Sequence, residues 1–167
     1  MQQRSQIFIK PNCGGEFYGY ANIFNVEDSQ GDIILNGAFS KTLRKNREIK
    51  LLLQHRQRDV IGCISSLKED FLGLYVAGKI DRGSKLGDTV YGYVKSNLLN
   101  GLSIGYIADD CHRDGRGRRI IESVDLLEIS LVSSPANRFS KIIYCKSKWM
   151  GDDLAKCKMH LFSKHID

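Results

Sequence analysis

The pattern of apolar and polar positions predicts a chain built mainly from β-strands. The clearest alternation lies in residues 60–80, where every second position after a polar stretch is taken by Leu74, Val76, Gly78 and Ile80. This period is typical of a β-hairpin whose turn lies in the polar stretch. Further strands are expected at 15–25, 49–55, 102–108, 119–133 and 142–145, and the polar segment 26–34 is expected to form a turn.

Two segments have the spacing of helices instead. Residues 84–99 carry apolar side chains four positions apart, at Leu86, Val90, Val94 and Leu98. Ser84 is a suitable N-cap for this helix, and Gly101 is expected just past its end. A shorter helix is predicted over 36–46, with Phe39 and Leu43 on one face.

Strands therefore dominate, and most of them follow one another as hairpins. The turn signal Asp114-Gly115 separates the last two long strands. We predict a mainly β (α+β) fold, a single-domain antiparallel β-barrel with helices packed outside. The 167 residues suit one domain, which we place at 1–148, with a basic C-terminal tail at 149–167.

Composition narrows the class of protein. With 42% hydrophobic and 26% charged residues, the chain is typical of a soluble globular protein. We expect no signal peptide and no membrane span, because no apolar run is long enough. The five cysteines are scattered and form no C-x-x-C, so neither a disulfide framework nor a zinc site is expected, and no cofactor is indicated.

The net charge of +6 comes largely from residues 41–58 and from the tail after residue 145. Solvated surface is the simplest interpretation, and attraction to nucleic acid or an acidic partner is the alternative. No DNA- or RNA-binding motif is present, and no aromatic residues interleave with the basic run. Nucleic acid is therefore an unlikely partner.

Residues 101–105 read Gly-Leu-Ser-Ile-Gly, a literal G-x-S-x-G. The nucleophile elbow of α/β-hydrolases needs a strand before the serine and a helix after it. Here a predicted helix precedes Ser103 and a predicted strand follows, so the order of elements argues against that fold. Taken alone, Ser103 could also be a small strand residue flanked by glycines because something packs closely against it.

A nucleophilic serine needs a base, usually an imidazole oriented by an acceptor. His55 ends the apolar run 49–55, at the rim of the expected core, although a structural role is the alternative. Glu128 stands among leucines and isoleucines, where a buried carboxylate needs a donor partner. The alternative is an acid on an edge strand that faces solvent. With the turn centred between Gly115 and Arg116, Ser103 is predicted directly opposite Glu128, about 5 Å away.

Four ordered blocks give the chain a family resemblance. They are YGYANIFNVEDSQGDIILNGAF (18–39), IKLLLQHRQRDVIGCI (49–64), GLSIGY (101–106) and LLEISLVSSPANRFSKI (126–142). Together they resemble the prohead (head-maturation) serine proteases of tailed bacteriophages, which are related in fold to the herpesvirus protease assemblin. The resemblance spans most of the chain.

The resemblance implies a serine endopeptidase that cuts the scaffolding segment of the major capsid protein, and often itself. It places that activity in the host cytoplasm, inside the assembling prohead, and it suggests a homodimer or higher oligomer with no membrane partner. A catalytically inactive capsid-assembly protein with the same fold, or a basic nucleic-acid-binding module, is the alternative.

The resemblance also assigns roles to residues of this chain. It implies His55 as base, Ser103 as nucleophile and Glu128 as the third member, although assemblin has a second histidine there. By the same analogy, the loop at Ala136, Asn137 and Arg138 would supply the oxyanion hole. No metal or cofactor is implied.

Overall fold

The computed structural model describes residues 14–45 and 47–145. Its strands are β1 (Glu16–Ile23), β2 (Asp32–Ile34), β3 (Lys50–Leu53), β4 (Arg56–Glu69), β5 (Gly73–Ile80), β6 (Gly101–Arg113), β7 (Arg119–Val132) and β8 (Lys141–Cys145). Its helices are α1 (Ser40–Lys45) and α2 (Lys85–Lys95). The prediction of a mainly β fold is confirmed. The predicted boundary at residue 148 and the tail at 149–167 lie outside the described residues.

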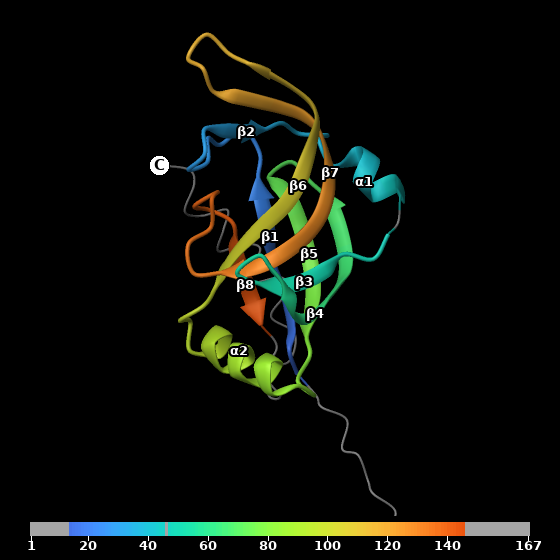
Figure 1. Cartoon of the computed structure of the whole chain (residues 1–167), viewed down its shortest axis with the longest axis vertical. Coiled ribbons are helices and arrows are strands. Elements are labelled where there is room, and N and C mark those ends of the chain that lie inside the picture. The colour runs from blue at the N-terminus through green and yellow to red at the C-terminus, as the bar shows by residue number, and fades with distance from the viewer. Residues whose placement is uncertain (1–13, 46, 146–167) are drawn as a thin grey trace, which may run out of the picture.

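The strands close into a barrel. Seven of them follow one another in the order β7-β3-β4-β5-β1-β8-β6, and β6 then pairs back onto β7 (Figure 1). The contact between β6 and β8 is narrow, with Gly101 opposite Lys141 as its one strand pair in the described chain. Backbone bonds from Leu102 N to Ser140 O (3.0 Å) and from Ile142 N to Asn100 O (2.8 Å) extend it. Beyond this contact, the edge of β6 that carries Ser103 does not pair with β8.

The expectation of purely antiparallel pairing is wrong at β7. Both β2 and β3 run parallel to β7, with Asp32–Ile34 beside Arg119–Ile121 and Lys50–Leu53 beside Glu128–Leu131. The 14 residues of β7 are long enough to offer one edge to two short strands in succession. Neither short strand neighbours β7 in sequence, so hairpin reasoning could not find these pairings. The first of them also makes part of the predicted turn 26–34 a strand.

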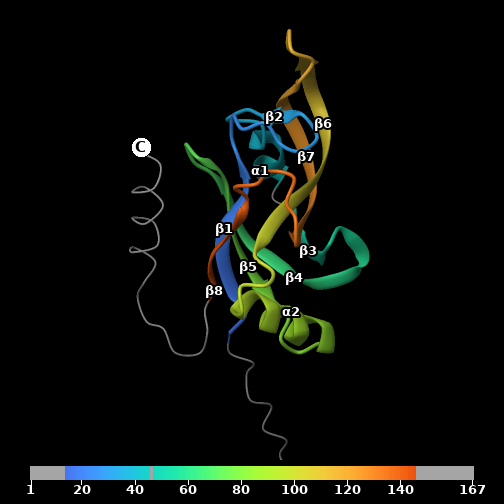
Figure 2. The same cartoon turned by 90° about the vertical axis from the view of Figure 1, so that its left-hand side faces the viewer.

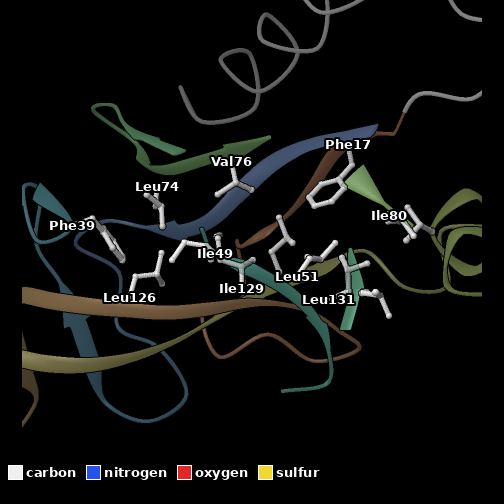
Figure 3. Close-up of a cluster of buried hydrophobic side chains, with 14 of the residues drawn as sticks. Phe17, Phe39, Ile49, Leu51, Leu74, Val76, Ile80, Leu126, Ile129 and Leu131 are labelled. Atoms are coloured by element: carbon white, nitrogen blue, oxygen red, sulfur yellow. The ribbon is translucent and has the colours of Figure 1, made fainter. Parts of the chain in front are cut away.

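The interior is filled by the apolar positions that alternate along the strands. Figure 3 shows side chains from β1, β3, β5 and β7 meeting between the walls, with Phe39 from the segment before α1. Fully buried members include Phe17, Leu51, Leu74, Val76, Leu126 and Ile129. This packed interior holds β3 and β7 side by side, which positions the candidate site.

The longer helix begins as predicted, because the side chain of Ser84 accepts a hydrogen bond from Gly87 N. It ends earlier than expected, since Asn97 takes a left-handed backbone at φ 59°, and Gly101 begins β6 instead of following the helix. Its buried face contains Val90 and Val94 as predicted, together with Gly87 and Tyr91, whereas Leu86 and Leu98 are exposed. The shorter helix starts at Ser40, because residues 36–39 form a turn with Gly37 at φ 91°.

The β6–β7 hairpin is longer than the barrel and projects beyond it (Figures 1 and 2). Its predicted register is wrong by two residues: Ser103 lies opposite Ser130, and Gly105 lies opposite Glu128. One residue of the error comes from the turn, because Arg113 pairs with Arg119 and the centre therefore falls on Arg116. The other comes from a bulge at Leu127, which has no partner across the ladder.

No helix in the described part of the chain has the length and apolar character needed to cross a membrane.

A buried ion pair joins β2 to β7. Asp32 is 4% exposed, and its Oδ1 accepts from Arg119 Nε at 2.8 Å while its Oδ2 accepts from the Tyr106 hydroxyl at 2.7 Å. The hydrogen bond from Arg119, partly offset by burial, lowers the pKa of Asp32. The stability that this carboxylate contributes is therefore present above its unfolded-state pKa of about 3.9, and is lost as pH falls through the lower folded value.

We expect Asp32→Asn to cost about 1–2 kcal/mol at neutral pH, a figure reduced because the Arg119 side chain is 38% exposed. Denaturant unfolding of both proteins between pH 7 and about pH 3 measures the cost. The difference between them should shrink at the acid end, and a difference that stayed constant with pH would contradict the assignment.

Candidate active site

His55 is placed by a two-residue turn between β3 and β4. Leu53 pairs with Arg56, and the residues between them, Gln54 and His55, both have left-handed backbones at φ 51° and 59°. Two positive φ values make the tight hairpin turn that suits the twist of paired strands, but side chains other than glycine or asparagine rarely adopt them. Such strain persists only where the surroundings impose it, and it concentrates at functional sites.

The surroundings here are the neighbouring strand β7. Gln54 N donates to Leu131 O at 2.9 Å, and His55 N donates to Ser130 Oγ at 3.1 Å. These two bonds continue the parallel β3–β7 pairing into the turn. The imidazole is thereby held over the outer face of β7, with its side chain 45% exposed.

Glu128 projects from that face of β7 and is 5% exposed. Its Oε1 lies 2.7 Å from His55 Nδ1, and its Oε2 accepts from Ser130 Oγ at 2.7 Å. Residues two apart on a strand share a face, so Ser130 is well placed to bind both the carboxylate and the backbone of His55. Gly105 lies across the ladder from Glu128, and a Cβ there would collide with the carboxylate.

Ser103 completes the chain of contacts, because its Oγ lies 3.0 Å from His55 Nε2. When the Nδ1 proton points to Glu128, Nε2 is left as an acceptor and the Ser103 hydroxyl donates to it. The structure therefore brings Ser103, His55 and Glu128 together in one line of hydrogen bonds. The alternative that Glu128 is an edge-strand acid facing solvent is wrong.

The carboxylate changes the proton affinity of the imidazole. The hydrogen bond to Glu128 raises the pKa of His55 above its ordinary value, and partial burial opposes the rise without cancelling it. A base with a raised pKa takes a proton more readily, and the same carboxylate stabilises the imidazolium that results.

A cavity of about 250 Å³ opens beside the Ser103 hydroxyl. Ala136 and Asn137 line it together with His55 and Ser103. The side chain of Asn137 is held in place by β1, because its Nδ2 donates to Ile23 O at 2.9 Å. Arg138 is not among the lining residues, and its guanidinium lies 4.7 Å from the centre of the Phe139 ring. Of the predicted oxyanion loop, two residues therefore reach the cavity and Arg138 does not.

Within residues 14–45 and 47–145, no group of three or more His, Cys, Asp or Glu side chains is arranged to hold a metal ion.

Residues 6–152 match the protein family described as caudovirus prohead serine protease. The chain belongs to this family. It is 35% identical over 137 residues to the prohead protease of Enterobacteria phage HK97, covering 80% of this chain and 61% of that protein. It is 29% identical over 133 residues to the prohead protease of Escherichia phage T5, covering 77% and 62%. The chain thus spans about three-fifths of the length of these prohead proteases.

Solved structures agree on the fold of this prohead protease family member. The bacteriophage T4 capsid assembly protease matches with a TM-score of 0.61 at 14% identity, covering 70% of this chain and 80% of that one. The protease of Kaposi's sarcoma herpesvirus matches with a TM-score of 0.57 at 12% identity, covering 90% and 77%. The varicella-zoster virus protease matches with a TM-score of 0.52 at 15% identity, covering 89% and 74%. The predicted resemblance to the assemblin fold is confirmed.

Sequence reasoning missed two residues that build the site. Ser130 offered a signal, because it follows Glu128 by two positions in an apolar strand and must share its face. The wrong register hid its position opposite Ser103. Gly105 was visible in the G-x-S-x-G motif, but the need for a glycine there depends on which residue lies opposite. Glu128 takes that position because Leu127 bulges out of the ladder.

Replacing Glu128 with glutamine tests the coupling in the site. Glu128→Gln removes the charge that raises the pKa of His55 but leaves the burial that lowers it, so the imidazole should titrate at a lower pH than in the wild type. NMR titration of the histidine ring protons measures this. The control is Glu122→Gln, which alters the carboxylate 3.0 Å from His112 on the projecting hairpin. An unchanged His55 titration in Glu128→Gln would show that the contact does not form in solution.

Proposed function

We propose that this chain is a serine endopeptidase that cleaves the scaffolding segment of a major capsid protein, and itself, during prohead maturation. The observation that carries the proposal is the line of contacts from Glu128 through His55 to Ser103, with distances of 2.7 and 3.0 Å. Membership of the prohead protease family supports the choice of a capsid protein as substrate. We place the activity inside the assembling prohead in the host cytoplasm, in a homodimer or higher oligomer.

The chemistry we propose is acyl transfer. His55 takes the proton from Ser103 Oγ as the oxygen attacks the substrate carbonyl, and then gives that proton to the leaving amine. Glu128 keeps the Nδ1 proton in place and stabilises the imidazolium. Ser130 positions both partners, because its hydroxyl donates to Glu128 and accepts from His55 N. Water then hydrolyses the acyl-enzyme, with His55 acting again as base.

We assign the oxyanion hole to backbone N–H groups of the loop that contains Ala136, Asn137 and Arg138. The support is position, since Ala136 and Asn137 line the cavity beside Ser103. The loop is also held rigidly, because Ala136 O accepts from Ser29 N at 3.0 Å and Asn137 O accepts from Ser140 N at 2.9 Å. Donors held in place before the reaction stabilise a tetrahedral intermediate best, and each contributes about 10²–10³-fold in rate.

Ser103→Ala tests the nucleophile. Co-expressed with its cognate capsid precursor, the wild-type chain should shorten the precursor, and the variant should leave it intact, with a loss of at least about 10⁴-fold in purified assays. The matched control is Ser123→Ala, on the same hairpin but opposite Asp110 and away from His55. Gel electrophoresis and mass spectrometry of the precursor give the readout.

Cleavage that survived in Ser103→Ala would overturn the nucleophile. An inert wild-type chain that still joined capsid assembly would favour the alternative of an inactive assembly protein. Salt-dependent DNA binding without any cleavage would favour the nucleic-acid-binding alternative.

A further inference from the structure

The cavity beside Ser103 is lined by a carboxylate that has no role in the proposed mechanism. Asp28, from the segment between β1 and β2, lines the same cavity as Ser103 and His55. Apart from His55, whose charge depends on pH, Asp28 is the one side chain of an acidic or basic residue (Asp, Glu, Lys or Arg) that lines this cavity in the described structure. An unpaired carboxylate in a concave site attracts a cationic or hydrogen-bond-donating group.

The charged residues nearest to Asp28 in the sequence, Glu27 and Asp32, already have ion-pair partners. Asp32 is bound by Arg119 and by the Tyr106 hydroxyl, as described above. Arg118 lies 3.7 Å from Glu27 and also binds Asp114. Among the described residues, Asp28 has no ion-pair partner within 4.0 Å, so its charge remains available to a ligand.

Only one oxygen of Asp28 is used by its own loop. Oδ1 accepts from Gln30 N at 2.8 Å and from Asp32 N at 2.9 Å, which holds the carboxylate in a fixed orientation. After burial and the contact with Asp32, Asp28 is a further cause that raises the pKa of the Tyr106 hydroxyl, which also lines the cavity.

The remaining wall suits the aliphatic part of a long side chain. Its aliphatic members are Ala21, Ile34, Leu102, Ile104 and Ala136. At about 250 Å³, the cavity is smaller than the roughly 300–1,000 Å³ typical of small-molecule sites and fits a single side chain. Lysine and arginine combine an apolar stem with a charged end, which is the pattern this cavity offers.

We propose that Asp28 is a specificity-determining residue: it makes the cavity select a lysine or arginine side chain on the substrate residue whose carbonyl Ser103 attacks. This inference rests on the proposed protease function. It adds the substrate class of the same site.

A pair of covalent probes tests the inference on the full chain. Both are diphenyl esters of aminoalkyl phosphonates, one with the side chain of lysine and one with the uncharged side chain of norleucine, which has the same four carbons and lacks the terminal nitrogen. In each reaction an Oγ–P bond forms at Ser103 and one P–O bond breaks, and the leaving phenol carries the hydroxyl proton away. Intact-mass spectrometry follows the rate of labelling.

The lysine probe should react at least about tenfold faster than the norleucine probe, because its ammonium group can bind the carboxylate of Asp28 and the methyl end of norleucine cannot. Asp28→Asn retains the Oδ1 acceptor that the loop needs and removes the charge, so the preference should fall to about threefold or less. The matched control Asp110→Asn makes the same charge change on the exposed projecting hairpin and should keep the wild-type preference.

The outcomes separate the two proposals. A simple alkyl fluorophosphonate, which needs no side-chain pocket, reports on the serine alone. If it labels Ser103 but the lysine probe shows no preference in the wild-type chain, or neither phosphonate reacts, the inference is wrong and the protease proposal stands. An undiminished preference in a folded Asp28→Asn protein also overturns the inference. If the fluorophosphonate itself fails, the protease proposal fails and the inference falls with it. Even if Asp28→Asn does not fold, the comparison of the two probes on the wild-type chain shows whether the cavity selects a cationic side chain.

Discussion

The carboxylate of Glu128 is the group on which the candidate site depends. Its residue is 5% exposed and stands between Leu127 and Ile129 in strand β7. A buried charge without a partner in such an apolar strand would destabilise the fold. The fold meets this cost with two donors, His55 Nδ1 on one oxygen and Ser130 Oγ on the other. Gly105 leaves the space that the carboxylate fills. A charge that must be satisfied therefore determines where the imidazole stands.

The parallel pairing of β3 with β7 makes this arrangement possible. It runs from Lys50 opposite Glu128 to Leu53 opposite Leu131, and the bond from Gln54 N to Leu131 O carries it into the turn. The turn then uses two residues with left-handed backbones, Gln54 and His55, to lead the chain into β4. Left-handed backbone costs roughly 1–2 kcal/mol for each residue other than glycine. The contacts with β7 and Glu128 offset that strain, so the barrel and the site are built by the same interactions.

The sequence was sufficient for the strand content, the barrel and the residue types of the site, because these depend on local periodicity and on unusual polar residues in apolar strands. His55 at the end of an apolar run and Glu128 inside one were both visible in this way. The parallel contacts of β7 were not, since they join segments far apart in the chain. The register of Ser103 was missed because of a combined shift of two residues: the turn is centred on Arg116, and the bulged residue Leu127 has no partner across the ladder. Neither feature can be seen in the local pattern of apolar and polar residues. Ser130 was hidden by that same shift.

In the function proposed here, the imidazole of His55 activates the hydroxyl of Ser103. The most direct measurement is to treat the full chain with an alkyl fluorophosphonate across a range of pH and to map the adduct by peptide mass spectrometry. We predict a single adduct, on Ser103, whose rate of formation rises as His55 loses its proton, with the midpoint above the ordinary histidine pKa because of Glu128. An unlabelled protein, or an adduct on a different serine, would contradict it.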